Sequence, residues 1–214
     1  MNESEGVIKY HLIHQYVPLK IQTPIGALNA WRSVFYKLEL IGQVENRYDG
    51  YGFGNISQRI ATGRADDIQF VITGTQTGNI SLLSKRDYCL VKQVDIKNNS
   101  LESMGEIEPS SEALTHASVY QQNNKITSVI HVHSPDIWRK TKKLKLPYIA
   151  DNIPYGTPEM ADEVARLLQN SPTQKTGIFT MLGHEDGVVV FSDSLEEAAC
   201  LLIKIYSKAI EDNQ

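Results

Sequence analysis

Short apolar runs joined by turns of hairpin length constrain the fold of this chain more than any other feature. The runs at residues 178–182 and 188–191 flank the turn GHEDG, residues 183–187, whose Asp-Gly end is typical of a β-hairpin. Further strands are predicted at residues 55–60, 67–73, 88–95 and 125–133. Because few strands are separated by a long helix, the sequence predicts a largely antiparallel sheet rather than a doubly wound one.

Helical periodicity occurs between these strands. Leu28, Trp31 and Phe35 recur at helical spacing, and Ser194 with Glu197 has the pattern of a capping box before another apolar face. Helices are predicted at residues 27–40, 110–123 and 157–169, and from residue 194 onward. We therefore expect an α/β fold, a single three-layer domain in which helices cover a mostly antiparallel central sheet.

Composition limits the class of protein. A chain of 214 residues with 41% hydrophobic content suits one domain, which we place at residues 26–214 after a leading segment, residues 1–25. The net charge of −4 and the pI of about 5.9 give no basic surface for nucleic acid. No apolar run is long enough to span a membrane, the N-terminus lacks a signal peptide pattern, and the two cysteines form no disulfide framework. These features predict a cytoplasmic protein without a membrane partner.

The sequence HVH at residues 131–133 ends a predicted strand and raises a chemical question. Alternate side chains of a strand share a face, so His131 and His133 point the same way and Val132 points the other way. A divalent metal binds neutral ring nitrogens and would resolve the crowding of two imidazoles. The alternative is a strand end with two half-exposed histidines that bond to backbone groups.

A catalytic metal needs three or four ligands, so further candidates are required. Glu112 and His116 share a helix face at spacing i, i+4, and one of them could reach the dyad. His184, in the hairpin turn, could project into a cleft or could simply cap its own turn. Glu112 could likewise be a solvated acid in the first helical turn. His11 and His14 lie in the leading segment, where we expect surface positions.

Features that bind anions lie near these candidates. Ser110 and Ser111 open a predicted helix whose free N–H groups and hydroxyls can hold a phosphate. Glycine-exposed backbone beside small polar donors occurs at Gly54-Asn55, Thr73-Gly74 and Thr77-Gly78. Glycine loops often only turn the chain, but beside the histidines they indicate metal and phosphate in one cleft.

Six motifs in order now make the chain resemble the class II aldolase/adducin family, and in particular its fuculose phosphate aldolase-like members. The motifs are GNIS (54–57), TGTQTG (73–78), PSSE (109–112), HVH (131–133), YGTPEMA (155–161) and HEDG (184–187). The resemblance implies that Zn²⁺ is held by His131, His133 and His184. It also implies that Glu112 is a ligand in the resting state and a base once substrate displaces it. The implied phosphate-binding residues are Asn55, Thr73, Gly74, Ser110 and Ser111, with Thr77 and Gly78 as alternatives to Thr73 and Gly74.

Two departures from the family pattern leave alternatives open. The family places its third histidine directly before a glycine, whereas His184 stands three residues before Gly187, so Asp186 is an alternative ligand. The family also supplies a tyrosine as proton donor after the HxH motif. Tyr148 is the counterpart we assign, with Tyr155 as the alternative.

The resemblance implies a zinc-dependent lyase that cleaves a small, phosphorylated ketose through a zinc-stabilised enediolate. The same residues could serve a dehydratase of the methylthioribulose phosphate type or a pentulose phosphate 4-epimerase. A non-catalytic adducin-like interaction module is the alternative from another class, and the presence of every expected ligand argues against it. The resemblance further implies a homotetramer with a sugar phosphate as its small-molecule partner.

Overall fold

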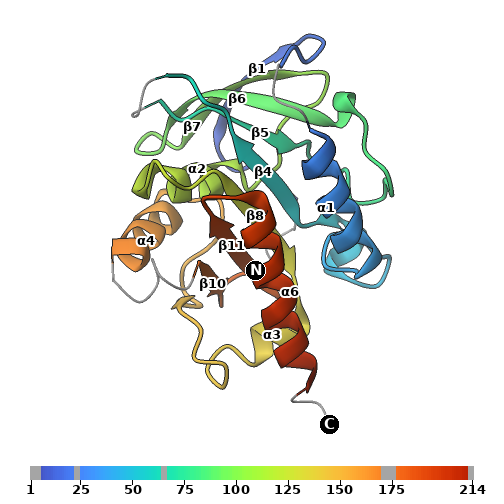
Figure 1. The fold of residues 1–214 in the computed structure, drawn as a ribbon. Helices are drawn as coiled ribbons and strands as arrows, with labels where there is room; N and C mark the ends of the chain where they lie inside the picture. Colours follow the sequence, from blue (N-terminus) through green and yellow to red (C-terminus); the bar gives the residue numbers. More distant parts are fainter. Residues whose placement is uncertain (1–5, 22–24, 64–66, 170–176, 212–214) are drawn as a thin grey trace.

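The computed structural model describes residues 6–21, 25–63, 67–169 and 177–211. These residues form a nine-stranded sheet in the order β1-β7-β6-β5-β4-β8-β11-β10-β9 (Figure 1). Strand β1 is parallel to β7 and β9 is parallel to β10, and the other neighbours in this sheet are antiparallel. The strands are β1 (His11–Tyr16), β4 (Asn55–Arg59), β5 (Phe70–Thr73), β6 (Tyr88–Asp95), β7 (Ser100–Gly105), β8 (Ser128–His133), β9 (Tyr148–Ile149), β10 (Ile178–Met181) and β11 (Gly187–Ser192). The expectation of a mostly antiparallel central sheet is confirmed.

Helices cover both faces of the sheet and complete the three layers (Figure 1). Helices α2 (Ala113–Gln122) and α4 (Pro158–Gln169) pack on one face, which we call the α2 face. Helices α1 (Gly26–Lys37), α3 (Pro135–Arg139) and α6 (Leu195–Glu211) pack on the other, the α6 face. Each face has its own apolar core, because alternate strand residues point to opposite sides.

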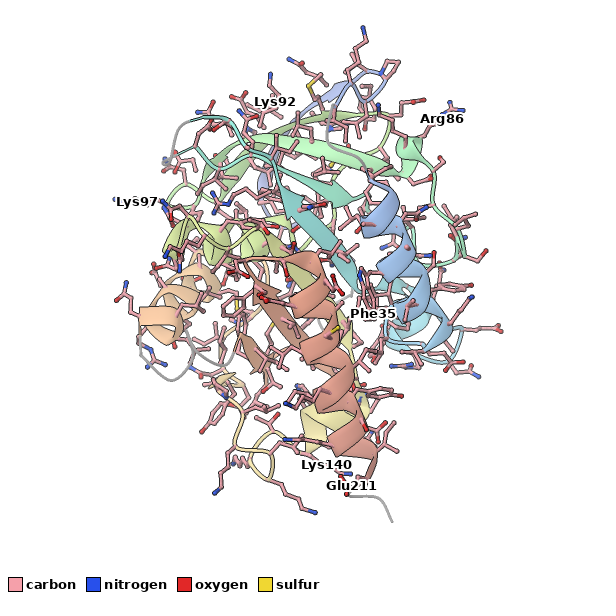
Figure 2. All side chains as sticks on the ribbon, viewed as in Figure 1. Phe35, Arg86, Lys92, Lys97, Lys140 and Glu211 are labelled. Carbon is pink, nitrogen blue, oxygen red and sulfur yellow. The ribbon has the colours of Figure 1, made fainter. Side chains whose placement is uncertain are left out.

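Side chains follow this layering (Figure 2). Phe35 is fully buried between α1 and the sheet, whereas Arg86, Lys92 and Lys97 extend into solvent. In the described parts of the chain, no helix has both the length and the apolar character needed to cross a membrane.

Two predicted helix ends differ from the structure. The first helix was expected to reach residue 40 but ends at Lys37, because Glu39 adopts a positive φ of 56° and the Leu40 amide bonds back to the Phe35 carbonyl at 2.9 Å. The helix expected from Ser110 begins instead at Ala113. Ser110 donates its amide to the carbonyl of Thr73 at 3.2 Å, so it belongs to a strand-like bridge rather than to the helix.

Strands β1 and β7 were not predicted. Leu101, Ser103 and Gly105 face the core from β7, and since one of the three is apolar, the strand lacks an alternating hydrophobic signal. Strand β1 lies in the expected leading segment, yet it pairs along its whole length with β7 and forms an edge of the sheet. The segment just before β1 reaches residues 109–112, where the buried Tyr10 donates a hydrogen bond to the carbonyl of Ser110 at 2.8 Å.

A two-stranded sheet of β2 (Gly42–Gln43) and β3 (Gly52–Phe53) lies beside the main one. The glycine-rich residues 48–54 would be expected to form an irregular loop, but they contain the 3₁₀ turn Tyr48–Gly50 and the short strand β3.

Candidate metal centre

The two histidines of the HVH sequence lie on the central strand β8, between β4 and β11. Ile130 and Val132 pack into the core of the α6 face, so His131 and His133 project toward the α2 face. Both imidazoles are buried, and their Nε2 atoms are 3.2 Å apart. The prediction that the two rings share a face is therefore confirmed.

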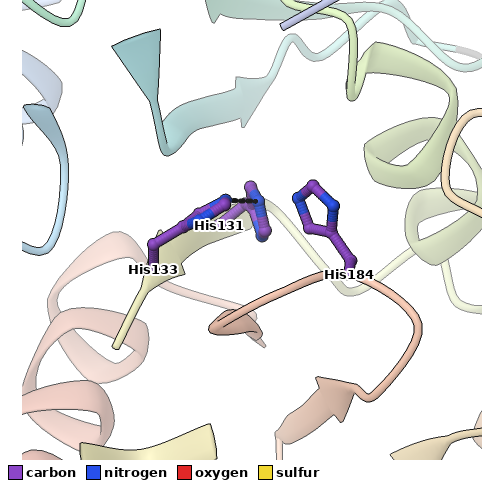
Figure 3. Close-up of side chains that lie close together, drawn as sticks. All are labelled: His131, His133 and His184. Carbon is purple, nitrogen blue, oxygen red and sulfur yellow. Dashed lines mark hydrogen bonds between the residues drawn. The ribbon is translucent and has the colours of Figure 1, made fainter. Parts of the chain in front are cut away.

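His184 reaches the same point from the turn between β10 and β11 (Figure 3). Each of the three histidines offers a ring nitrogen, and these nitrogens all lie within 4.8 Å of one another. Gly187 opposes His133 in the sheet, and a Cβ on Gly187 would lie 2.7 Å from Cδ2 of His184. The glycine of the HEDG turn thus leaves room for the His184 ring to lie against β11.

Burial keeps these imidazoles neutral. It lowers the pKa of His131 to about 4, and it lowers the pKa values of His133 and His184 well below the usual value. Neutral ring nitrogens are the form that binds a metal. Tetrahedral zinc with bonds of about 2.0–2.1 Å places two nitrogen ligands about 3.3 Å apart. The Nε2 separation of 3.2 Å in the dyad matches that geometry, so the residues present fit such an ion.

Glu112 places a carboxylate beside the cluster, although the described groups whose ligand atoms cluster are the three histidines alone. It is the N-cap residue of α2, only 1% exposed, and its Oε1 lies 3.9 Å from Nε2 of His184. Of the pair Glu112 and His116, the structure therefore brings Glu112 to the histidines. His116 is buried behind them, with its Nδ1 2.7 Å from the hydroxyl of Ser57. His14 is half-buried on β1 and contacts the hydroxyl of Ser103.

Asp186, the alternative ligand, has a different contact. Its Oδ2 accepts a hydrogen bond of 2.7 Å from the hydroxyl of Tyr48, and its carboxylate is absent from the set of described side chains whose ligand atoms cluster.

The predicted phosphate-binding residues meet beside the histidines. Asn55 lies directly opposite His131 in the pairing of β4 with β8, so the two side chains share the α2 face. Thr73 joins β4 to the SSE segment, residues 110–112 of the PSSE motif. Its Oγ1 accepts from the amide of Ile56 at 3.3 Å, and its carbonyl accepts from the amide of Ser110. Gly74 pairs with Pro109, which brings Ser110 and Ser111 to the same edge. The five predicted residues, Asn55, Thr73, Gly74, Ser110 and Ser111, are all buried.

Thr77 and Gly78 are placed differently. The Thr77 hydroxyl donates to the carbonyl of Gly74 at 3.0 Å, and the Thr77 carbonyl accepts from the buried guanidinium of Arg32 at 2.8 Å. This end of the loop is therefore tied to α1, whereas Thr73 and Gly74 lie against the SSE segment.

Aromatic rings that the sequence did not single out enclose the histidines. Tyr48 packs edge-on against His133 with ring centroids 4.6 Å apart, and Phe53 contacts the same ring at 5.4 Å. Tyr155, considered only as an alternative proton donor, lies 4.6 Å from His184. Tyr148 lies on the edge strand β9, and its side chain is 42% exposed.

A lysine from the N-terminal segment also approaches the cluster. Nζ of Lys9 lies 3.7 Å from the centre of the Tyr155 ring, on which it forms a cation–π contact. Its charge contributes, after burial and the neighbouring His131, to the lowered pKa of His184. No local pattern marks Lys9, because parallel pairing of β1 with β7 brings its segment there.

Comparison with known proteins identifies the family of this chain. Residues 43–208 match the family model described as Class II Aldolase and Adducin N-terminal domain, and the chain belongs to this family. A relative named L-fuculose phosphate aldolase, from Methanococcus maripaludis, is 29% identical over 144 residues, which is 59% of this chain and 76% of the relative. The resemblance drawn from the six motifs is confirmed.

Solved structures share the fold. L-fuculose-1-phosphate aldolase from Thermus thermophilus has a TM-score of 0.60 at 19% identity, over 86% of this chain and 89% of that one. YgbL from Escherichia coli, described as a putative aldolase/epimerase/decarboxylase, also has a TM-score of 0.60 at 19% identity, over 85% and 84% of the two chains.

Proposed function

We propose that this protein is a zinc-dependent lyase that cleaves a small, phosphorylated ketose. One observation carries the proposal. Three buried, neutral histidines gather their ring nitrogens within 4.8 Å, beside the carboxylate of Glu112. His131, His133, His184 and Glu112 would hold the ion. When bound, zinc supplies a Lewis acid that polarises the carbonyl group of a substrate.

Glu112 is the base in this proposal. It sits at the start of α2, where the helix dipole favours a negative charge, and a cation bound by the histidines would favour ionisation further. A carboxylate that substrate has displaced from the ion would remain within reach of the carbon next to the carbonyl. Glu112 would then take up or return a proton at that carbon.

The substrate phosphate would lie against Asn55, Thr73, Gly74, Ser110 and Ser111. Asn55 lies opposite His131, and its amide would donate to the phosphate together with the hydroxyls of Ser110 and Ser111. The amides of Gly74 and Ser110 already donate to the carbonyls of Asp87 and Thr73, so in this proposal these two residues shape the pocket. Two cations approach the histidines. Lys9 lies over the ring of Tyr155, and Arg47 donates a hydrogen bond to the hydroxyl of Tyr48.

Two tyrosines, Tyr148 and Tyr155, are candidates for the proton donor. Tyr148, which we assigned from the sequence, is exposed on the edge strand β9, where a neighbouring subunit of the proposed homotetramer could present or receive it. Tyr155 is 1% exposed and contacts His184 in the same subunit. Replacement of each tyrosine by phenylalanine tests the assignment. The donor is the residue whose loss lowers turnover about 100-fold or more while zinc binding stays intact.

The experiment for the function uses protein purified without chelator or a histidine tag. Elemental analysis should find about one zinc per chain, and ketose phosphates incubated with this protein should yield an aldehyde and dihydroxyacetone phosphate. His131→Ala should lose the metal. Glu112→Gln should keep the fold and lose at least about 100-fold in turnover.

Product analysis also separates the alternative reactions. Loss of water would identify a dehydratase and inversion at one carbon would identify an epimerase, both on the same ligands. Absence of metal after incubation with zinc would contradict every enzymatic proposal and favour an interaction module.

A further inference from the structure

The contact between Tyr48 and Asp186 joins two segments that are 138 residues apart in the chain. Both residues have a positive φ, 50° for Tyr48 and 61° for Asp186. Aspartate tolerates this left-handed conformation, but a tyrosine rarely adopts it. A backbone held in this way persists only where surrounding contacts determine it, and such positions cluster at functional sites.

Two contacts of Tyr48 connect it with the histidine cluster, and its ring also packs against Phe53 at 5.0 Å. Its ring packs against His133, its hydroxyl donates to Asp186 at 2.7 Å, and it accepts a hydrogen bond of 2.7 Å from the guanidinium of Arg47. Because Arg47 can only donate, the phenol proton is directed to the Asp186 carboxylate. The result is a chain of three groups from Arg47 through Tyr48 to Asp186.

Asp186 in turn is tied to both sides of the cluster. It lies two residues after His184, in the same turn, and its carbonyl accepts from the amide of Ser134, the residue after His133, at 2.8 Å. A group that fixes Asp186 therefore fixes the turn that carries His184 relative to the strand end that carries His133.

We propose that Tyr48 is a positioning residue of the metal centre, which holds His133 by ring contact and the His184 turn by its hydrogen bond to Asp186. The inference rests on the proposed function, since it assumes that the histidines bind a metal. It assigns Asp186 a role as the anchor of the turn and not as a ligand. Groups that orient ligands in this way commonly change metal affinity by about 10–100-fold when they are removed.

The test uses the full chain, stripped of metal and titrated with cobalt(II), whose visible absorption reports the geometry and number of its ligands. Tyr48→Phe removes the hydroxyl and keeps the ring, and Asp186→Asn keeps the shape of the anchor. Tyr51→Phe is the control, because Tyr51 belongs to the same loop and is 39% exposed. Thermal unfolding of each metal-free protein shows whether it remains folded.

Tyr48→Phe and Asp186→Asn should each weaken cobalt binding by about 10–100-fold and shift the absorption band, whereas Tyr51→Phe should match the wild type. Tyr48→Phe removes the hydrogen bond, and Asp186→Asn weakens it by removing the acceptor's charge. Because both changes act on this one bond, the double variant should bind cobalt no more weakly than whichever single variant binds it less tightly. If Tyr48→Phe does not fold, Asp186→Asn alone tests the inference. Its cobalt affinity and absorption band are then compared with those of the wild type, and unchanged values would contradict the inference.

Three outcomes would overturn the inference. Wild-type affinity and absorption in Tyr48→Phe would show that the hydroxyl positions nothing. Complete loss of cobalt binding in Asp186→Asn with little change in Tyr48→Phe would make Asp186 a direct ligand. Failure of the wild type itself to bind cobalt would remove the proposed function together with this inference, whereas the first two outcomes leave the proposed function intact.

Discussion

Replacement of Gly187 by alanine should damage the proposed metal centre without unfolding the protein. The new Cβ would lie 2.7 Å from Cδ2 of His184 and 3.1 Å from its carbonyl oxygen. Carbon atoms in contact prefer about 3.5–4.0 Å, so the imidazole has to move by roughly 1 Å. Gly187 is not among the glycines with a positive φ, so the contact itself, and not backbone strain, causes the effect.

The expected size follows from the tolerance of metal coordination. Ligand distances at a metal vary by about 0.2 Å, so a shift of roughly 1 Å removes His184 from an ideal position. We expect zinc affinity to fall at least about 100-fold, as it does when ligand orientation is lost. Overpacking of the buried turn should lower the free energy of unfolding of the metal-free protein by about 1–3 kcal/mol.

Competition with a chromogenic chelator measures the zinc affinity, and thermal unfolding of metal-free protein measures the stability. Gly26→Ala is the matched control, because a Cβ at Gly26 meets no atom within 4 Å. His184→Ala combined with Gly187→Ala should bind zinc no more weakly than His184→Ala alone. Folded Gly187→Ala protein with wild-type zinc affinity would refute the reasoning, since His184 would then either tolerate the contact or not be a ligand.

Three further predictions concern stability. Removal of metal by chelation should lower the melting temperature of the wild type, because zinc at 100 times its dissociation constant adds about 2.7 kcal/mol, and a variant His133→Ala should show no such shift. The pKa of His116 lies well below that of a histidine in the unfolded chain, chiefly because of burial, so the unfolded state binds more protons as the pH falls below about 6.5. Metal-free protein should therefore lose stability between pH 7.5 and 5.5, and His116→Gln should lose less. Denaturant titrations at both pH values measure the free energy of unfolding. An equal loss in the wild type and in His116→Gln would contradict the prediction. Arg32→Met should lower the free energy of unfolding by more than about 2 kcal/mol, because the buried Thr77 carbonyl and the less buried carbonyls of Ile80 and Ser81 lose their donor. The exposed Arg86→Met should change it by less than about 0.5 kcal/mol.

Much of the fold was predictable because the relevant signals are local. Strand β6 was expected at residues 88–95 and has those bounds, and the last helix begins where Ser194 accepts from the amide of Glu197 at 3.1 Å. The capping box is only half formed in the hydrogen bonds described, since the Glu197 carboxylate accepts from Ser192 at 3.0 Å. Strand alternation likewise places His131 and His133 on one face without reference to any distant residue.

The sequence by itself determined the class of fold, the histidine dyad and, through its ordered motifs, the family. Tertiary structure decided which distant groups complete the site. His184 reaches the dyad because β11 pairs with β8 in a register that sets Gly187 opposite His133. Tyr48 and Lys9 reach it through a loop and an edge strand, and no periodicity marks them. The physical reason is that side-chain direction within an element follows from local backbone geometry, whereas the contacts between elements depend on the register and packing of the whole sheet.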